Sequence, residues 1–216
     1  MRRILFLSVC FAMFFGVCVS AQSLGGYNAT QWVDDASFQF SSRNFQQCLA
    51  SAGNAITLDD SLDYAYFLRG ASYYHLGVYH QSVTELTTAI RLNPSNILYY
   101  KWRGVALTKR YITDEALADF DKVLQLDPDD TFALSRRGQL YQSMDEHTRA
   151  IADFDRVIAL TERNYFAYYC KADSCAEAGL NQQAVENYKI FIELADGKVK
   201  KSYITYAQDR ISELSK

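Results

Sequence analysis

The feature that most limits how this chain can fold is an internal repeat of 34 residues. Three stretches of the sequence, which end at Asn96, Asp130 and Asn164, align with one another without gaps. A glycine preceded by an arginine recurs in them at the same interval, at Gly70, Gly104 and Gly138. A fixed period of about 20 to 50 residues is typical of chains in which equal structural units stack one upon the next.

Each unit is predicted to contain two helices. In the second half of a unit, apolar residues recur three and four positions apart, which is the spacing of one helix face, as in Ala116, Phe120, Val123 and Leu124. A small residue opens each predicted second helix: Cys48, Ser82, Ala116, Ala150 and Ala184. Because each helix pair leaves an apolar face that only the next pair can cover, stacking is expected to form the core.

On this pattern the sequence resembles the tetratricopeptide repeat family. The early aromatic position of that family's unit is occupied by Trp32, Tyr66, Tyr100, Leu134 and Tyr168. The proline that ends the second helix is present as Pro94 and Pro128 in two units, and Asp60, Glu162 and Asp196 replace it in the others. The resemblance implies an all-α fold, a right-handed α-solenoid of five helix pairs plus a C-terminal capping helix. It also implies a protein that binds other proteins rather than an enzyme.

The repeat divides the chain into consecutive segments. A signal peptide is expected at 1–21 and a linker at 22–28, and the capping helix at 199–216. The five units are expected at 29–62, 63–96, 97–130, 131–164 and 165–198, with the first and the fifth degenerate.

The first 21 residues have the pattern of a secretion signal. Two arginines precede an uncharged apolar run that ends at Val19 and is shorter than the roughly 20 residues that cross a bilayer comfortably. Cleavage after Ala21 would give an exported chain, periplasmic or secreted, that starts at Gln22 and has no further membrane span. The alternative is an uncleaved signal that anchors the protein in a membrane.

Removal of the signal would leave three cysteines, Cys48, Cys170 and Cys175, an odd number that predicts no disulfide framework. Cys170 and Cys175 lie five residues apart on one predicted helix. They would point about 140° apart around its axis, which is poor geometry for a disulfide. All three are expected to be small packing residues.

Charged residues follow the period as well. The acids Glu85, Asp119 and Asp153 each lie sixteen residues after a repeated arginine, in the second helix of the same unit. We expect each acid to pair with that arginine. This ladder is interpreted as structural, because acids at the same period would neutralise a basic binding stripe.

No catalytic residue, metal ligand or cofactor is expected. The three histidines, His75, His80 and His147, do not have the spacing of a zinc site. The adjacent glycines Gly25 and Gly26 are not followed by the lysine of a phosphate-binding loop. The formal net charge of −3 argues against nucleic acid as a partner.

The expected site is a groove. In tetratricopeptide arrays the first helices line a concave surface, and positions two, five, six and nine of each unit commonly face the ligand. The resemblance implies these partner-binding residues: Tyr64, Phe67, Leu68, Lys101, Trp102, Phe132, Arg136, Gln139, Phe166 and Tyr169. Trp102 is expected as apolar anchor, with Lys101 and Arg136 as anion partners.

Such a groove suits an extended or helical peptide with apolar side chains and one acidic group. We therefore expect a non-catalytic interaction scaffold of the cell envelope or secretory compartment, with a protein or peptide partner. The alternative is an accessory subunit of an envelope transport system that binds a small molecule or a lipid.

Overall fold

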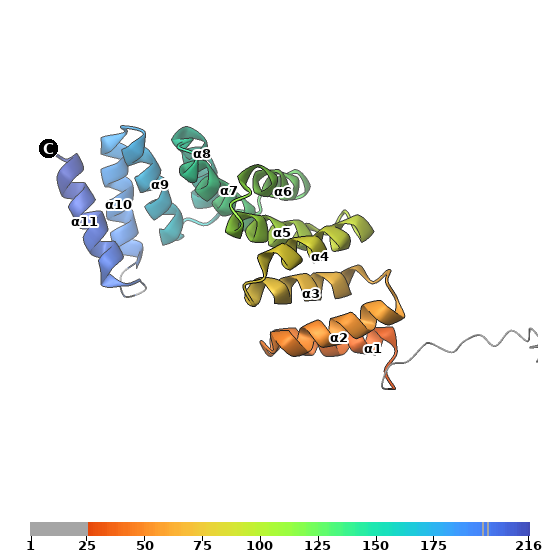
Figure 1. The fold of residues 1–216 in the computed structure, drawn as a ribbon. Helices are drawn as coiled ribbons and strands as arrows, with labels where there is room; N and C mark the ends of the chain where they lie inside the picture. The colour runs from red at the N-terminus through yellow and green to blue at the C-terminus, as the bar shows by residue number, and fades with distance from the viewer. Residues whose placement is uncertain (1–25, 196, 198) are drawn as a thin grey trace, which may run out of the picture.

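The computed structural model describes residues 26–195, 197 and 199–216, so the expected signal peptide lies outside the described residues. The described part of the chain contains eleven α-helices (Figure 1). Their bounds are α1 Ala29–Ser41, α2 Phe45–Leu58, α3 Asp63–His75, α4 Tyr79–Leu92, α5 Ile97–Lys109, α6 Thr113–Leu126, α7 Thr131–Ser143, α8 His147–Leu160, α9 Tyr165–Glu177, α10 Asn181–Ala195 and α11 Lys201–Leu214.

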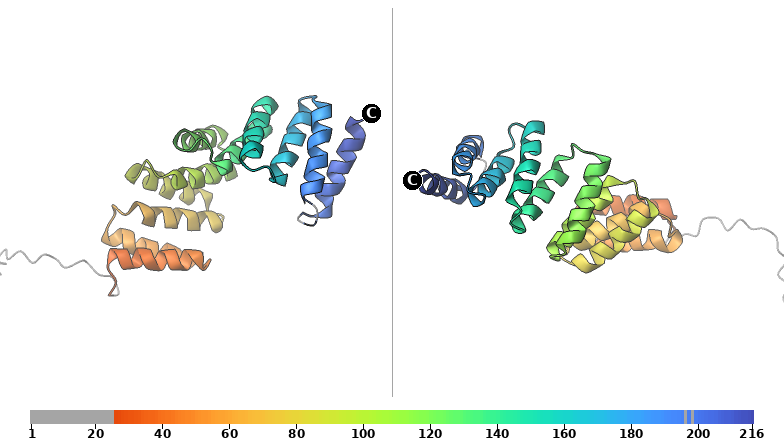
Figure 2. Two further views of the ribbon diagram at one scale, coloured as in Figure 1. Left: turned by 180° about the vertical axis from the view of Figure 1, so that it is seen from behind. Right: turned by 90° about the horizontal axis from the view of Figure 1, so that it is seen from above.

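The helices form pairs that stack along the chain, and each helix packs on the one that precedes it. The first helices of the pairs begin at residues 29, 63, 97, 131 and 165, so the structure has the period of the sequence. Figures 1 and 2 show the stack running from α1 at one end to α11 at the other. The expectation of an all-α solenoid is confirmed.

The repeated glycines are sites of close contact between the two helices of a pair. A Cβ atom at Gly104 would lie 2.9 Å from Cζ of Phe120, and one at Gly138 would lie 2.9 Å from Cζ of Phe154. The repeated small residues at the start of the second helices have no exposed surface: Cys48, Ser82, Ala116, Ala150 and Ala184. The period therefore marks the positions where two helices need small side chains to approach.

The last helix, α11, covers the C-terminal end of the core. Its Ala207 is fully buried, and Ile204, Ile211 and Leu214 pack partly buried against the cluster that contains Tyr188. The Tyr188 hydroxyl donates a hydrogen bond to the Asp173 carboxylate on α9 beneath it.

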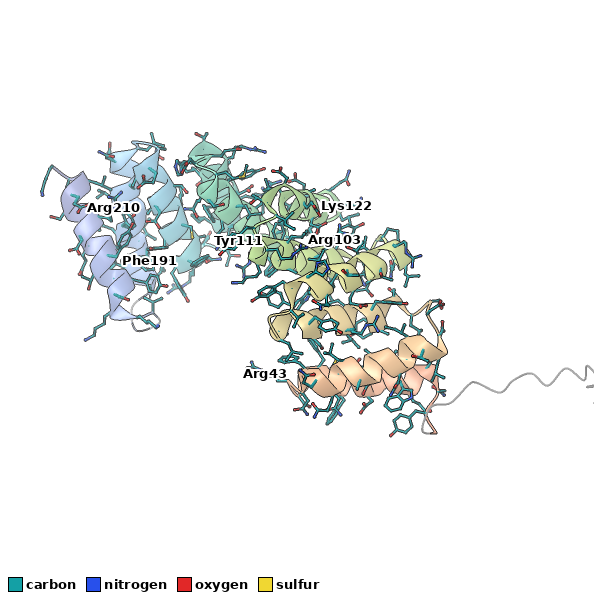
Figure 3. The ribbon with its side chains drawn as sticks, viewed as in Figure 1. Arg43, Arg103, Tyr111, Lys122, Phe191 and Arg210 are labelled. Carbon is teal, nitrogen blue, oxygen red and sulfur yellow. The ribbon has the colours of Figure 1, made fainter. Side chains whose placement is uncertain are left out.

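The predicted ion pairs within the helix pairs are present. Arg69 bonds Glu85 at 2.7 Å, Arg103 bonds Asp119 at 2.6 and 2.9 Å, and Arg137 bonds Asp153 at 2.7 and 2.9 Å. Figure 3 labels Arg103 within the stack.

The ladder also joins one pair to the pair before it, which the sequence reading did not predict. Arg103 Nη1 donates to Thr87 Oγ1 at 3.2 Å, and Arg137 Nη1 lies 2.7 Å from an oxygen of Asp121. Lys171 lies 2.6 Å from Asp155 in the same way. These charges bind neighbouring elements together, so their structural interpretation is confirmed.

The three cysteines of the described chain, Cys48, Cys170 and Cys175, are free and buried. Burial, with a smaller contribution from the Asp173 carboxylate, raises the pKa of the Cys170 thiol to about 12. Among the described residues, no group of three or more His, Cys, Asp or Glu side chains could hold a metal ion. Within the same residues no helix has the length and apolar character to cross a membrane.

Candidate functional site

A cavity of about 370 Å³ lies between three first helices, α3, α5 and α7. We call it the central cavity. It is lined by Tyr74, Leu98, Lys101, Trp102, Val105, Phe132 and Arg136. Five of these seven side chains are apolar or aromatic, so the cavity suits an apolar side chain of a ligand.

Two more cavities share residues with the central cavity. One reaches toward α9 and is lined by Thr131, Phe132, Ser135, Arg136, Gln139, Asn164 and Phe166. The other lies toward the last turns of α3, α5 and α7 and is lined by Tyr74, Val105, Thr108, Lys109, Arg136, Gln139, Leu140 and Ser143. Arg136 lines all three, which therefore form one elongated surface, named here the groove.

The charged side chains that line the groove are all cations: Lys101, Lys109 and Arg136. Lys101 forms an ion pair with Asp130, the residue that caps the N-terminus of α7. The Lys101 ammonium therefore already has a carboxylate partner, and binding of a ligand anion by Lys101 stays a prediction.

Arg136 has no such partner. Its Nη1 donates to Oε1 of Gln139 at 3.2 Å, and its guanidinium lies 5.2 Å from the ring centroid of Phe132. Within the described chain it forms no ion pair with a carboxylate. Arg136 is exposed, so it is the cation of the central cavity that remains available to an anion.

Trp102 is both a wall of the central cavity and a packing residue. Its ring centroid lies 5.4 Å from that of His75 and 5.6 Å from that of Tyr74, both nearly edge to face, and it is partly buried against the core. Trp102 therefore also contributes to the packing of the stack, because its side chain joins α5 to α3. Burial and the charge of Arg43 lower the pKa of His75, so the imidazole beside these rings is neutral at pH 7.

The structure brings together only some of the predicted partner-binding residues. Lys101, Trp102, Phe132, Arg136, Gln139 and Phe166 line the groove. Phe67 and Leu68 are only 4% and 1% exposed. They are core residues, so the expectation that they contact the partner is corrected. Tyr64 is exposed and stacks on Phe67, with ring centroids 5.4 Å apart, but it is not among the groove's lining residues.

Tyr169 lies elsewhere. It lines a separate cavity of about 220 Å³ near the C-terminal end, together with Tyr165, Phe166, Phe191, Val199 and Tyr203. None of the lining residues of this C-terminal cavity that belong to the described part of the chain is charged. Phe166 belongs to both this cavity and the groove.

Leu98 and Val105, which occupy the ligand-facing positions two and nine of their unit, also line the groove. Several other groove residues are absent from the prediction, among them Tyr74, Thr108 and Lys109. Tyr74 and Thr108 both occupy position twelve, one helical turn beyond the pattern. Position twelve lies three residues after position nine and so on the same helix face, and this spacing could have identified both residues.

Comparison with known proteins gives a match to a repeat model in two segments of the chain and a similar fold. A family model described as "Tetratricopeptide repeat" matches residues 63–96 and 133–164. No curated protein sequence matches the chain.

Three solved structures have a similar fold. YrrB, described as "a TPR protein with an unusual peptide-binding site", superposes with a TM-score of 0.74 at 20% identity, over 84% of this chain and 92% of that chain. A MamA protein gives a TM-score of 0.73 at 19% identity, over 79% of this chain and 93% of that chain. MamA 41-end from Desulfovibrio magneticus RS-1 gives 0.74 at 16% identity, over 80% and 97%. At these identities the likeness shows the fold.

Proposed function

We propose that the chain is a tetratricopeptide-repeat protein that binds an extended peptide segment of a partner protein in the groove. Tetratricopeptide-repeat scaffolds are non-catalytic interaction proteins. The single observation that carries the proposal is the groove itself, in which three cavities share residues across four first helices. An apolar side chain of the partner fills the central cavity, and an acidic group of the partner pairs with Arg136.

Two features of the groove support this assignment. Its walls are mostly apolar, so they reward burial of a side chain such as leucine or phenylalanine. The guanidinium of Arg136, which has no carboxylate partner among the described residues, lines the central cavity and is exposed, so a carboxylate can approach it from solvent and form a two-point contact.

The shape of the surface favours a chain over a compact ligand. The groove extends from the last turns of α3 and α5 to Phe166 on α9. A lipid or small molecule would be expected to occupy one enclosed cavity instead. The function as a transport accessory subunit is therefore the weaker proposal, and the C-terminal cavity, whose described lining residues are uncharged, is the place where such a ligand would fit.

The test is capture of partners from an extract of the source cells with immobilised protein. Arg136→Glu should lose proteins that the wild type retains, and the loss should be salt-dependent, because the contact is electrostatic. Arg163→Glu is the matched control, since Arg163 is exposed in the turn before α9 and lies outside the lining of the groove. Equal capture by both variants would remove the groove as the binding surface.

The location and the division of the chain are part of the same proposal. We propose export to the envelope or the secretory compartment, with a mature chain from Gln22, on the strength of the apolar run behind two arginines. N-terminal sequencing of the exported protein checks this, and a retained Met1 in the membrane fraction would replace it by an anchored form. The five helix pairs are proposed as the five units, with α11 as the cap.

A further inference from the structure

One residue in the turn after each first helix has a left-handed backbone. These residues are 34 apart, with φ of 60° at Arg43, 78° at Gly77, 58° at Tyr111, 59° at Asp145 and 76° at Gly179. Glycine adopts this conformation without steric cost and aspartate tolerates it, whereas a bulky side chain is strained there. Tyr111 therefore occupies a position that glycine would fill more easily.

Packing does not hold Tyr111 in this conformation. Its side chain is 92% exposed, and among the described residues it makes no hydrogen bond or ring contact. Its backbone forms the turn: the N–H of Tyr111 donates to the carbonyl of Thr108, and the N–H of Ile112 donates to the carbonyl of Leu107, both at 3.1 Å. A strained residue that the fold does not require points to a role in contact with another molecule.

The turn that carries Tyr111 lies beside the groove. α5 ends at Lys109, and both Thr108 and Lys109 line the cavity that Arg136 also lines. Arg110 lies between Lys109 and Tyr111, so two cations directly precede the tyrosine in sequence. Figure 3 labels Tyr111 at this end of α5.

The charge of the groove indicates the chemistry of the partner. The whole chain has a formal net charge of −3, with 25 acidic and 22 basic residues. Among the described residues, the lining of the groove nevertheless contains Lys109 and Arg136 besides the paired Lys101, and no carboxylate. Complementary potentials favour correct partners and disfavour wrong ones, so this surface selects an acidic segment.

We propose that Tyr111 is a partner-contact residue that extends the groove over the α5–α6 turn, and that the segment bound there is acidic. This inference rests on the proposed function of the groove. The acidic segment places an apolar side chain in the central cavity and carboxylates beside Arg136 and Lys109. Its backbone then passes over the turn, where the Tyr111 ring covers it. Tyrosine and arginine are the side chains that most often dominate such contacts.

Tyr111→Gly should have opposite effects on stability and binding. Removal of the left-handed tyrosine should raise the melting temperature by about 2 to 4 °C. The same change should lower affinity at least about fivefold for a fluorescein-labelled peptide with one leucine between two runs of three glutamates. Fluorescence anisotropy measures the affinity. A twin peptide with glutamines in place of the glutamates should bind the wild type more weakly.

The matched control is Asp145→Gly, which changes the same turn position in the next pair without loss of an aromatic ring. It should leave the affinity for the glutamate peptide unchanged. The inference about Tyr111 is wrong if Tyr111→Gly binds that peptide as tightly as the wild type while Arg136→Gln binds it more weakly. That outcome would still support the groove as the binding site. If the wild type binds the two peptides equally, or binds neither, the proposal that the bound segment is acidic is wrong. Capture of partners from the extract then tests separately whether the groove is the binding surface.

Discussion

Gly53 and Gly104 both lie inside helices, but only Gly104 has a neighbour where a side chain would be placed. Nothing lies within 4 Å of a Cβ atom built on Gly53, whereas at Gly104 the ring of Phe120 is 2.9 Å away. Alanine is favoured over glycine in a helix by about 1 kcal/mol. Gly53→Ala should therefore raise the free energy of unfolding by roughly that amount. Gly104→Ala should lower it by about 1 kcal/mol or more, because Phe120 is fully buried and has no room to move.

Urea unfolding of the two variants beside the wild type measures both effects. If the two substitutions stabilise the protein equally, the repeated glycines are not packing requirements. In that case their period would need another explanation.

A second residue-scale prediction concerns the buried thiol of Cys170. Burial raises its pKa from 9.0 to about 12, so the folded protein keeps the thiol proton at a pH where the unfolded chain loses it. The corresponding stability is fully present below about pH 9 and is lost as the pH rises toward about 12. Between about pH 8 and about pH 10.5, the free energy of unfolding should therefore fall less in Cys170→Ala than in the wild type. The same slope in both would assign the alkaline loss to other groups.

The sequence predicts which residues recur but not which of them remain accessible. Phe67 and Arg136 both occupy positions that the family pattern assigns to the ligand. The ring of Tyr99 in the next pair stacks on Phe67 with centroids 5.3 Å apart, and Phe67 is buried. Arg136 stays exposed at the groove. The size of a neighbouring side chain is not part of a period, so it could not be inferred from the alignment of the units.

At the scale of helices, the arginine ladder has strong and weak members. Arg137 bonds Asp153 in its own pair and Asp121 in the pair before, whereas Arg69 bonds Glu85 only. Asp153 is 5% exposed, and removal of the guanidinium would leave a buried carboxylate without its charged partner. Arg137→Met should therefore cost about 2 to 3 kcal/mol, and Arg69→Met about 1 kcal/mol or less.

Thermal or urea unfolding of the two methionine variants distinguishes these costs. The comparison is matched, because both changes keep an unbranched apolar chain at the same position of the repeat. Equal losses would mean that the contact between Arg137 and Asp121 does not add to the ladder.

The helices themselves were predictable because each level of the sequence indicates the same fold. Glycine or a small residue recurs where helices touch, apolar residues recur at helical spacing, and the helix starts repeat with the same interval. The central cavity of the groove was less predictable, since it depends on side chains from three different pairs. Tyr74, Trp102 and Phe132 come from α3, α5 and α7, and no single unit contains that arrangement.

At the scale of the whole molecule, the core is divided along the stack. One cluster of buried residues extends from Ala36 in α1 to Leu140 in α7. Another joins α9, α10 and α11 and contains Ala172, Phe191 and Ala207. In a solenoid each pair contacts only its neighbours, so stability is the sum of local terms and a local loss need not spread.

Phe191→Ala should therefore loosen one end of the molecule and leave the other end intact. Phe191 is 2% exposed in the C-terminal cluster, and its truncation should cost about 3 to 5 kcal/mol in that region. Hydrogen exchange followed by mass spectrometry should show faster exchange in α9, α10 and α11. Amides of α1 to α4 should keep their wild-type rates, because the cluster that holds them contains no residue of the C-terminal one. An equal acceleration in all helices would mean that the chain opens as one cooperative unit and that the division of the core has no energetic consequence.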